Sequence, residues 1–246
     1  GEYNTFKKAN QRIKNLINSG ADIIDIGGES TRPGSKIINP KNELERVKSV
    51  IKKFNKSFSK SLLSIDTRKS QVIDYAVKVK ADIVNDVSCF KFDQNSYKSV
   101  RNKNIWKIIH HMQGTPQTMQ INPKYHHVLL DIYDFFEKEI SNFKNDKYKM
   151  KLILDPGIGF GKKLKHNLII LSKISIFHSL GFPILIGTSR KRFINQISGK
   201  YDTKERIGGT LSSTIYSLSQ GVKIFRVHNV EEVKQGILVF EKLLNK

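Results

Sequence analysis

The chain has a single cysteine, Cys89, among its 246 residues. One thiol excludes an intramolecular disulfide, and no motif of a catalytic nucleophile surrounds it. The sequence also lacks an apolar run of the roughly 18 residues that mark a membrane-spanning helix, and no secretory signal opens the chain. These absences argue against a disulfide-rich secreted protein and against a membrane protein. They predict a cytoplasmic protein in a reducing compartment.

Acidic residues are scarce, with 22 Asp and Glu against 43 Lys and Arg, so the formal net charge is +21. Such a surplus is typical of proteins that bind nucleic acid or anionic membranes. Here the lysines are scattered along the chain rather than gathered in one block, which is typical of the solvent faces of helices. We therefore predict neither nucleic-acid nor membrane partners. The surplus is compatible with an attraction for small anionic molecules.

No linker, low-complexity block or shift in composition divides the chain, so residues 1–246 are predicted to form a single domain. Short apolar runs alternate with longer stretches of helical periodicity, and this alternation predicts a parallel sheet. The seven predicted strands are 22–26, 62–65, 82–84, 105–109, 152–154, 183–186 and 222–225. The predicted helices are 4–19, 40–53, 70–79, 94–102, 127–143, 166–180, 204–219 and 230–244.

Seven strands favour a (β/α)8 TIM barrel over a doubly wound open sheet, which usually has about five or six. A barrel of this type needs an eighth strand, and the chain begins at a helix. We therefore expect the first strand to precede Gly1. Without it, the strands 22–26 and 222–225 would expose unpaired backbone groups. The expectation is that residues 1–246 alone form a poorly stable and nearly inactive fragment.

Each predicted strand is followed by polar residues. They are Thr31 and Arg32, Asp66, Asn85, His111, Asp155, Ser189 to Lys191, and finally Arg226 and His228. Any one of them could be a helix cap or a loop residue. In a barrel, however, all the carboxyl ends of the strands meet at one mouth, where the active site lies. The whole set is therefore predicted to form one site.

The predicted site combines two kinds of chemistry. Asp66, Asn85 and Asp155 follow early and middle strands, and their oxygens could read a flat heterocycle with several N–H groups. The last two strands are followed by cations, in the region where such barrels frequently bind phosphate. These cations are Arg190, Lys191, Arg226 and His228.

A glycine-rich turn, Gly157 to Gly161, follows the strand 152–154. A dinucleotide site would need a different spacing and an acidic residue about 20 positions later. The glycines are instead predicted to let the backbone pass close to a ligand beside Phe160. The pairs His110-His111 and His126-His127 lack zinc-ligand spacing, so no protein-held zinc is expected.

Seven motifs, in order along nearly the whole chain, resemble the dihydropteroate synthase family of pterin-binding enzymes. They are ADIIDIGGESTRPGS, SIDTRKSQVI, ADIVNDVS, HMQGTPQTMQ, LILDPGIGFGK, GTSRKRFI and RVHNV. The resemblance implies a (β/α)8 barrel and a transferase of folate biosynthesis. Such an enzyme joins p-aminobenzoate to 6-hydroxymethyl-7,8-dihydropterin diphosphate, forming dihydropteroate and releasing pyrophosphate. The resemblance also implies a homodimer and Mg²⁺ as cofactor.

The resemblance further implies a role for each matching residue. The pterin-binding residues would be Asp66, Asn85, Asp155, Phe160, Gly187 and Lys191, of which Asp66, Asp155 and Lys191 would be catalytic. The diphosphate would be held by Thr31, Arg226 and His228. The p-aminobenzoate pocket would be formed by Arg32, Pro33, Ser189 and Arg190. The metal-binding Asn of the family would precede Gly1, so no metal ligand is expected in this chain.

Other functions fit parts of the sequence. Methyltetrahydrofolate–corrinoid methyltransferases share the pterin-binding barrel but have no diphosphate to bind, so the SRK and RVH motifs argue against them. A non-catalytic basic binding protein would explain the charge alone. An inactive paralogue would explain the motifs only if catalytic residues had been lost, and the motifs after the first strand are intact.

Overall fold

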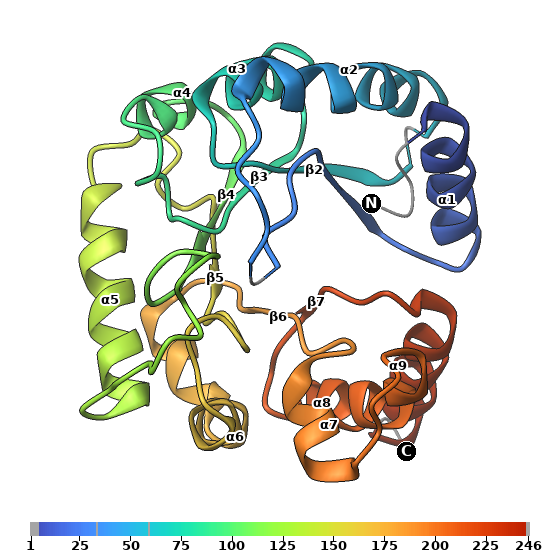
Figure 1. The fold of residues 1–246 in the computed structure, drawn as a ribbon, viewed down its shortest axis with the longest axis vertical. Helices are drawn as coiled ribbons and strands as arrows, with labels where there is room; N and C mark the ends of the chain where they lie inside the picture. The colour runs from blue at the N-terminus through green and yellow to red at the C-terminus, as the bar shows by residue number, and fades with distance from the viewer. Residues whose placement is uncertain (1–4, 33, 59, 245–246) are drawn as a thin grey trace.

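The computed structural model describes residues 5–32, 34–58 and 60–244. In this part of the chain, seven parallel strands run through the middle of the molecule and helices surround them (Figure 1). The strands are β1 (Ile23–Gly27), β2 (Leu62–Asp66), β3 (Ile83–Asp86), β4 (Trp106–His110), β5 (Leu152–Asp155), β6 (Leu185–Ile186) and β7 (Ile224–Phe225). The α-helices are α1 (Phe6–Asn18), α2 (Pro40–Ser57), α3 (Ser70–Lys78), α4 (Ser96–Val100), α5 (Val128–Asn142), α6 (Leu164–Ser172), α7 (Arg192–Ser198), α8 (Ile207–Ser219) and α9 (Val230–Leu244).

The strands pair in the order in which they occur along the chain. A continuous parallel sheet contains β1 to β5, and β6 pairs with β7. A parallel bridge between Leu154 and Ile184 connects the two parts. Parallel strands joined in sequence by helical crossovers define an α/β fold. The predicted α/β fold with a parallel sheet is therefore confirmed.

Closure of the sheet into a barrel is not observed among the described residues, because no strand pairing joins β1 to β7. Side chains connect this side of the molecule instead. Arg226, which follows β7, contacts Asp25 of β1 with 3.2 Å between Nε and Oδ2. Lys234 of α9 contacts Asp22, just before β1, with 3.0 Å between Nζ and Oδ2. The eight-stranded closure stays a prediction.

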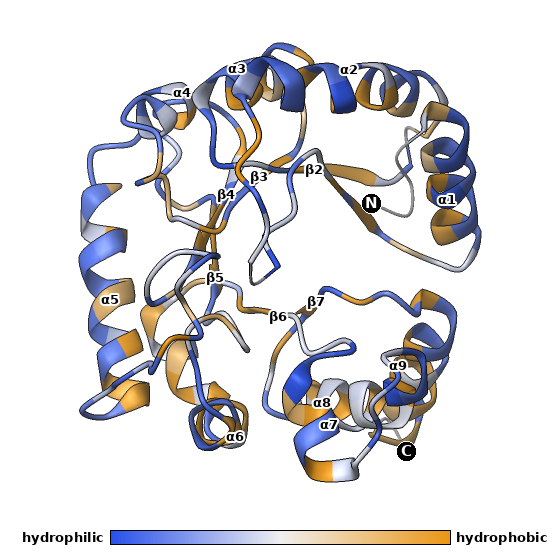
Figure 2. Cartoon of the chain, in the orientation of Figure 1, coloured by the Kyte–Doolittle hydropathy of each residue, from blue (hydrophilic) through white to orange (hydrophobic). Residues whose placement is uncertain are grey.

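The two faces of the strands serve different purposes, because successive side chains of a strand point to opposite faces. A small buried cluster on the inner face contains Ile83, Ile108, Ile153 and Leu185. The intervening residues, such as Val84 and Ile109, belong to the large core beneath the helices. Figure 2 shows the result, with strands that are largely hydrophobic and helices that are hydrophilic on part of their surface.

Three helical segments differ from the prediction. The predicted helix 204–219 begins as a 3₁₀ helix, Lys204–Arg206, and α8 starts only at Ile207. The helix α7 is absent from the sequence-based assignment, because its seven residues are too short for a clear period. The predicted helix 166–180 is divided into α6 and a 3₁₀ helix, Ile174–Leu180. The break falls at Lys173, whose φ of −130° and ψ of 30° lie outside the helical range.

The N-terminus of α3 is satisfied from a distant loop. The cap position is Lys69, which makes no side-chain cap hydrogen bond. Asp93, from the loop after β3, accepts hydrogen bonds from the backbone N (2.9 Å) and the hydroxyl (2.7 Å) of Ser70. A carboxylate distant in sequence thus satisfies the free end of the helix. Thr5 caps α1, and its hydroxyl accepts a hydrogen bond of 3.3 Å from the backbone N of Lys8.

Candidate active site

The inner face of the sheet ends in polar side chains, which we call the polar layer: Asp25, Asp66, Asn85, His110, Asp155 and Arg226. Asn85, His110 and Asp155 are each two residues beyond an isoleucine of the inner cluster, so they continue the same face. The strand register places Asp66 beside Asn85 and His110 beside Asp155. Asn85, His110 and Asp155 are at most 2% exposed. Buried polar side chains such as these three require polar partners.

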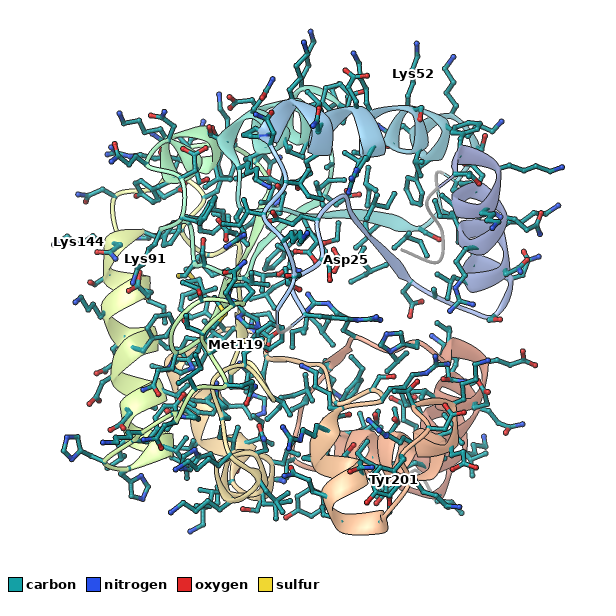
Figure 3. All side chains as sticks on the ribbon, in the orientation of Figure 1. Asp25, Lys52, Lys91, Met119, Lys144 and Tyr201 are labelled. Carbon is teal, nitrogen blue, oxygen red and sulfur yellow. The ribbon has the colours of Figure 1, made fainter. Side chains whose placement is uncertain are left out.

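Arg226 connects three strands through carboxylates of the polar layer. Its Nε lies 3.2 Å from Oδ2 of Asp25, and its Nη1 lies 3.4 Å from Oδ2 of Asp155. Asp25 also accepts a hydrogen bond of 3.3 Å from the amide of Asn85. Figure 3 shows Asp25 near the centre of the molecule, whereas Lys52, Lys144 and Tyr201 lie at its periphery. Arg226 is therefore a structural link as well as a candidate anion ligand.

The sequence-based site omits Asp25, although a signal for it exists. An acid within the apolar run Ile23 to Ile26 is unexpected in a buried strand unless it faces a polar space. Its register partner is Ser64 of β2, which is also a polar residue within a strand. Both residues are on the inner face.

The carboxyl of Asp66 is shifted towards its neutral form. Burial raises the pKa of its carboxyl well above the usual range, and the nearby Asp25 raises it further, while Arg226 acts in the opposite direction. Its Oδ1 is buried and has no hydrogen-bond partner among the described residues. A ligand that offers an N–H donor or positive charge at this point would favour the ionised form.

Asp155 begins the glycine-rich turn. Its Oδ1 accepts a hydrogen bond of 2.8 Å from the backbone N of Gly157. Gly157 has a φ of +67°, and a Cβ there would lie 2.0 Å from the backbone oxygen of His111. Glycine is therefore required by the neighbouring backbone. The sequence predicted a close approach of this turn to a ligand; the observed close approach is to the end of β4.

Lys191 lies over this turn. Its ammonium donates to the backbone oxygen of Ile158 and is 4.4 Å from the ring centroid of Phe160. The stem of the side chain passes Gly159, where a Cβ would be 3.1 Å from its Cδ. The cation–π contact and the hydrogen bond hold the ammonium at the edge of the polar layer. The predicted neighbours Lys191, Phe160 and Asp155 are thus brought together.

The pKa of Lys191 predicts a limit to activity at alkaline pH. Burial lowers this pKa from 10.5 to about 8; Asp155 opposes the shift and Arg226 adds to it. The ammonium is therefore lost as the pH rises through about 8. We expect kcat/KM for the pterin substrate to fall with an apparent pKa near this value, measured between about pH 6 and 10. The Lys191→Arg variant, which stays charged, should lack this alkaline limb. The same limb in that variant would show that another group titrates.

The side chains of Ser189 and Arg190 already form hydrogen bonds with other residues of the protein. The hydroxyl of Ser189 lies 3.0 Å from Nδ1 of His228 and accepts a hydrogen bond of 3.1 Å from the backbone N of His228. The guanidinium of Arg190 donates two hydrogen bonds, of 3.1 and 2.7 Å, to the amide oxygen of Asn229. These contacts tie the loop after β6 to the loop after β7. If Ser189 and Arg190 contact p-aminobenzoate as predicted, their hydrogen bonds with His228 and Asn229 must first break.

His228 differs from the expected cation. Burial of its ring and the nearby Arg190, Arg32, Arg12 and Lys191 lower its pKa to about 4. It is therefore neutral at pH 7 in the absence of a bound anion. An anion among these cations would raise the pKa, since the positive charges that oppose protonation would be balanced.

The loop after β1 carries Thr31 and Arg32, and Pro33 lies outside the described residues. The loop extends to the loop after β4, where the backbone N of Gly34 donates to Pro116 (3.3 Å) and the amide of Gln117 donates to Ser35 (2.9 Å). Thr31 is half-buried and Arg32 is exposed. The two loops together cover the carboxyl ends of the strands (Figure 1).

A buried ionic network, which we call the Glu29 network, fixes the start of this loop. It contains Glu29, Glu43, Arg68 and Lys69. Arg68 donates two hydrogen bonds, of 3.1 and 2.9 Å, to one oxygen of Glu29, and Lys69 donates one of 2.9 Å to the other. Lys69 also contacts Glu43 of α2. All four side chains are at most 4% exposed. The network joins the loops after β1 and β2 to α2.

A cavity of about 250 Å³ lies beside Lys191. It is lined mainly by cationic and amide side chains: Lys162, Lys163, Lys191, Arg192, Gln120, Asn122, Asn167 and Gln196. No acidic residue lines it. This lining suits an anionic group. Arg192, the first residue of α7, is absent from the sequence-based site because that helix was not predicted.

No group of three or more His, Cys, Asp or Glu side chains in the described part of the chain could hold a metal ion. The carboxylates Asp25 and Asp155 are instead bound to Arg226. Within the described residues, none of the helices has the length and apolar content that a membrane span requires.

A sequence model described as "Pterin binding enzyme" matches residues 1–228. The chain belongs to the pterin-binding enzyme family. A relative in this family, dihydropteroate synthase of Escherichia coli strain K12, is 37% identical over 246 residues, which cover 100% of this chain and 86% of that protein. The match confirms the predicted family and enzyme class, a transferase of the dihydropteroate synthase type in folate biosynthesis.

Solved structures of pterin-binding enzymes share the fold. Yersinia pestis dihydropteroate synthase, in complex with a sulfonamide drug, has a TM-score of 0.94 at 33% identity and covers 100% of this chain and 88% of that one. The Xanthomonas albilineans enzyme, in complex with 7,8-dihydropteroate, has a TM-score of 0.88 at 27% identity and covers 98% and 90%. These relatives favour the predicted synthase over the corrinoid methyltransferase and the non-catalytic binding protein.

Proposed function

We propose that this chain condenses p-aminobenzoate with 6-hydroxymethyl-7,8-dihydropterin diphosphate to give dihydropteroate and pyrophosphate. The observation that supports this most strongly is the polar layer, with Lys191 and Phe160 beside it. Unpartnered oxygens of Asp66 and Asn85 are buried there. Both need hydrogen-bond donors, and a pterin ring offers several N–H groups. Gly187, half-buried after β6, lies beside this layer, since a Cβ there would be 3.7 Å from the Cβ of Arg226.

The reaction breaks the C–O bond between the pterin methylene and the diphosphate, and the electron pair leaves with the oxygen. The positive charge that develops spreads into the conjugated ring. Asp155, fixed by Gly157 and Arg226, is placed to stabilise that charge, and Asp66 joins it when ionised. The neutral amino group of p-aminobenzoate attacks the methylene and then loses a proton. For this step the protein mainly positions the reactants.

The cations of the last two loops suit the departing diphosphate. The guanidinium of Arg226 lies between the carboxylates of Asp25 and Asp155. His228 gains a proton most readily beside an anion. Thr31 would complete the contacts from the loop after β1. The carboxylate of p-aminobenzoate would meet Arg32, while Arg190 and Ser189 would release their present partners only when the substrate binds. Arg192 is a further cation within this region.

Mg²⁺ as cofactor is part of this proposal. Hard oxygen ligands of a diphosphate bind this ion well, and the protein need supply few ligands. Because the described carboxylates form no metal cluster, the ion would be held chiefly by the substrate.

The finer architecture is also a proposal. The structural likeness to solved dihydropteroate synthases supports a TIM barrel, whose mouth is the polar layer.

A homodimer is supported by an apolar depression on α8 and α9, which contains Leu211, Ile215, Tyr216 and Phe240. Sedimentation equilibrium tests it, with Ile215→Glu expected to give monomers. The cytoplasmic location stays a prediction.

The order of binding should reflect the shared site. Thr31, Arg226 and His228 are the residues proposed to hold the diphosphate, and an anion there should order the loop that holds p-aminobenzoate. We expect calorimetry to show that p-aminobenzoate binds at least about 5-fold more tightly when pterin and pyrophosphate are present, a typical coupling. Equal Kd values with and without these ligands would contradict the coupling.

The direct test of the proposed function is to measure the release of pyrophosphate with a coupled assay in the presence of both substrates. Product formation should depend on both p-aminobenzoate and the pterin diphosphate. An Asp155→Asn variant of unchanged melting temperature serves as the control for contaminating activity. A wild-type protein that binds neither substrate would overturn the proposal.

A further inference from the structure

One buried side chain of the polar layer has no partner and no role in the reaction described above. Both ring nitrogens of His110 are buried without a hydrogen-bond partner among the described residues. The nearest acidic atom is Oδ2 of Asp155, 3.8 Å from Nε2, which is too far for a hydrogen bond. Buried polar groups almost always have a partner. Two unpartnered nitrogens on one ring therefore indicate a place where a ligand binds.

The position of His110 is fixed by the strands. It ends β4 two residues after Ile108 of the inner cluster, and its register partner is Asp155. Phe160 packs edge-on against its ring, with 4.5 Å between centroids and 82° between planes. Phe160 in turn carries the ammonium of Lys191 on its ring. The imidazole is thus fixed between the residues assigned to the pterin ring.

The other unpartnered atoms of the polar layer have a matching chemistry. Oδ1 of Asp66 and Oδ1 of Asn85 are buried acceptors. A neutral imidazole offers one donor and one acceptor. A flat heterocycle whose edge alternates N–H groups with acceptor atoms could satisfy all of them, whereas a simple anion or an apolar ring could not.

His111, the next residue, gives an internal contrast. It points to the outer face, where its Nδ1 lies 2.9 Å from Nζ of the buried Lys162. Its ring packs against Phe135 with 4.9 Å between centroids. A purely structural histidine in this region therefore has a polar partner, and His110 does not.

We propose that His110 is a substrate-contacting residue that hydrogen-bonds the edge of the pterin ring, beside Asn85 and Asp155. The proposal rests on the proposed function and adds a residue to it. The charged groups around the ring are Asp155, Arg226, Lys162 and Lys191. Burial, partly offset by Asp155, and the three cations lower the pKa of His110 to about 4, so the ring is neutral at pH 7.

The first test observes the ring directly. Wild-type protein labelled with ¹⁵N-histidine is titrated with 6-hydroxymethylpterin, and the His110 signals are identified by their loss in His110→Gln. We expect the His110 ring nitrogens to shift and the His111 ring nitrogens to move little. Addition of p-aminobenzoate alone should leave the His110 signals in place. This measurement needs no variant that folds poorly.

The second test is kinetic. His110→Leu should raise KM for the pterin diphosphate by about 10-fold, the loss expected for one hydrogen bond, and leave KM for p-aminobenzoate within about twofold. His110→Gln, which keeps a donor and an acceptor, should stay within about threefold of wild type. His111→Leu is the matched control on the outer face, and it should change the melting temperature rather than KM for the pterin.

The outcomes separate the two proposals. If wild-type protein binds pterin, while the His110 nitrogens do not respond and His110→Leu leaves both KM values unchanged, then the role of His110 is wrong and the proposed function stands. If wild-type protein neither binds 6-hydroxymethylpterin nor releases pyrophosphate, both are wrong.

Discussion

Replacing Lys191 with alanine is expected to lower kcat/KM by about 30- to 1,000-fold while the melting temperature stays unchanged. The fold-change corresponds to a loss of about 2–4 kcal/mol of transition-state stabilisation, as is usual for a charge-assisted contact in a partly closed site. The ammonium lies at the edge of the polar layer, held by Ile158 and Phe160. Steady-state kinetics with varied pterin diphosphate measures the effect.

Lys144→Ala is the control for this prediction. Lys144 is exposed and lies at the periphery of the molecule (Figure 3). This variant should keep kcat/KM within about twofold of wild type, as expected for a surface position outside the site. Equal losses in both variants would mean that general positive charge, rather than the placement of Lys191, supports the reaction.

The strands and most helices could be predicted because their signals are local. A helix at 230–244 follows from apolar periodicity, and the observed α9 is Val230–Leu244. The short strands are recognisable as apolar runs between turns, such as Leu62–Asp66. The pairing order also follows, since parallel strands joined by helices usually neighbour their successors. Barrel closure depends on what pairs with the outer edges of β1 and β7, and no local pattern determines that pairing.

The polar layer could be predicted only in part, because the register of a strand decides which of its residues point to the inner face. Asp66, Asn85, Asp155 and Arg226 follow strands and are brought together. For β4 the sequence offers both His110 and His111, and a shift of one residue exchanges the faces. The prediction selected His111, whereas the structure places His110 on the inner face.

Contacts between loops could not be predicted at all. Ser189 and Arg190 look free in the sequence, yet His228 and Asn229 occupy them. The same is true of Glu29, whose partner Arg68 is 39 positions away. Hydrogen bonds of this kind arise from the tertiary arrangement, and no propensity or spacing encodes them.

The Glu29 network should make a large contribution to stability. Lys69 lies between the carboxylates of Glu29 and Glu43, and all three side chains are at most 4% exposed. Removing the cation would leave Glu43 as a buried carboxylate without its counter-charge. Breaking a buried pair in this way is much more costly than the pair itself is stabilising, because the remaining charge stays desolvated.

Lys69→Met is therefore expected to lower the free energy of unfolding by about 3–5 kcal/mol, a large part of the roughly 5–15 kcal/mol of a typical domain. The melting temperature should fall by about 6–20 °C for a chain of this size. Urea denaturation and calorimetry measure the two quantities. Adding Glu43→Gln should recover part of the loss, because the unpaired carboxylate is then removed.

Lys48→Met is the matched control, because Lys48 forms an ion pair of 3.8 Å with Glu45 on the solvent face of α2. These side chains are 52% and 64% exposed, so the same substitution should cost no more than about 1 kcal/mol. If Lys69→Met is no more destabilising than Lys48→Met, then the buried network does not fix the loop after β1. In that case Thr31 and Arg32 must be positioned by the contacts of Gly34 and Gln117 with the loop after β4 instead.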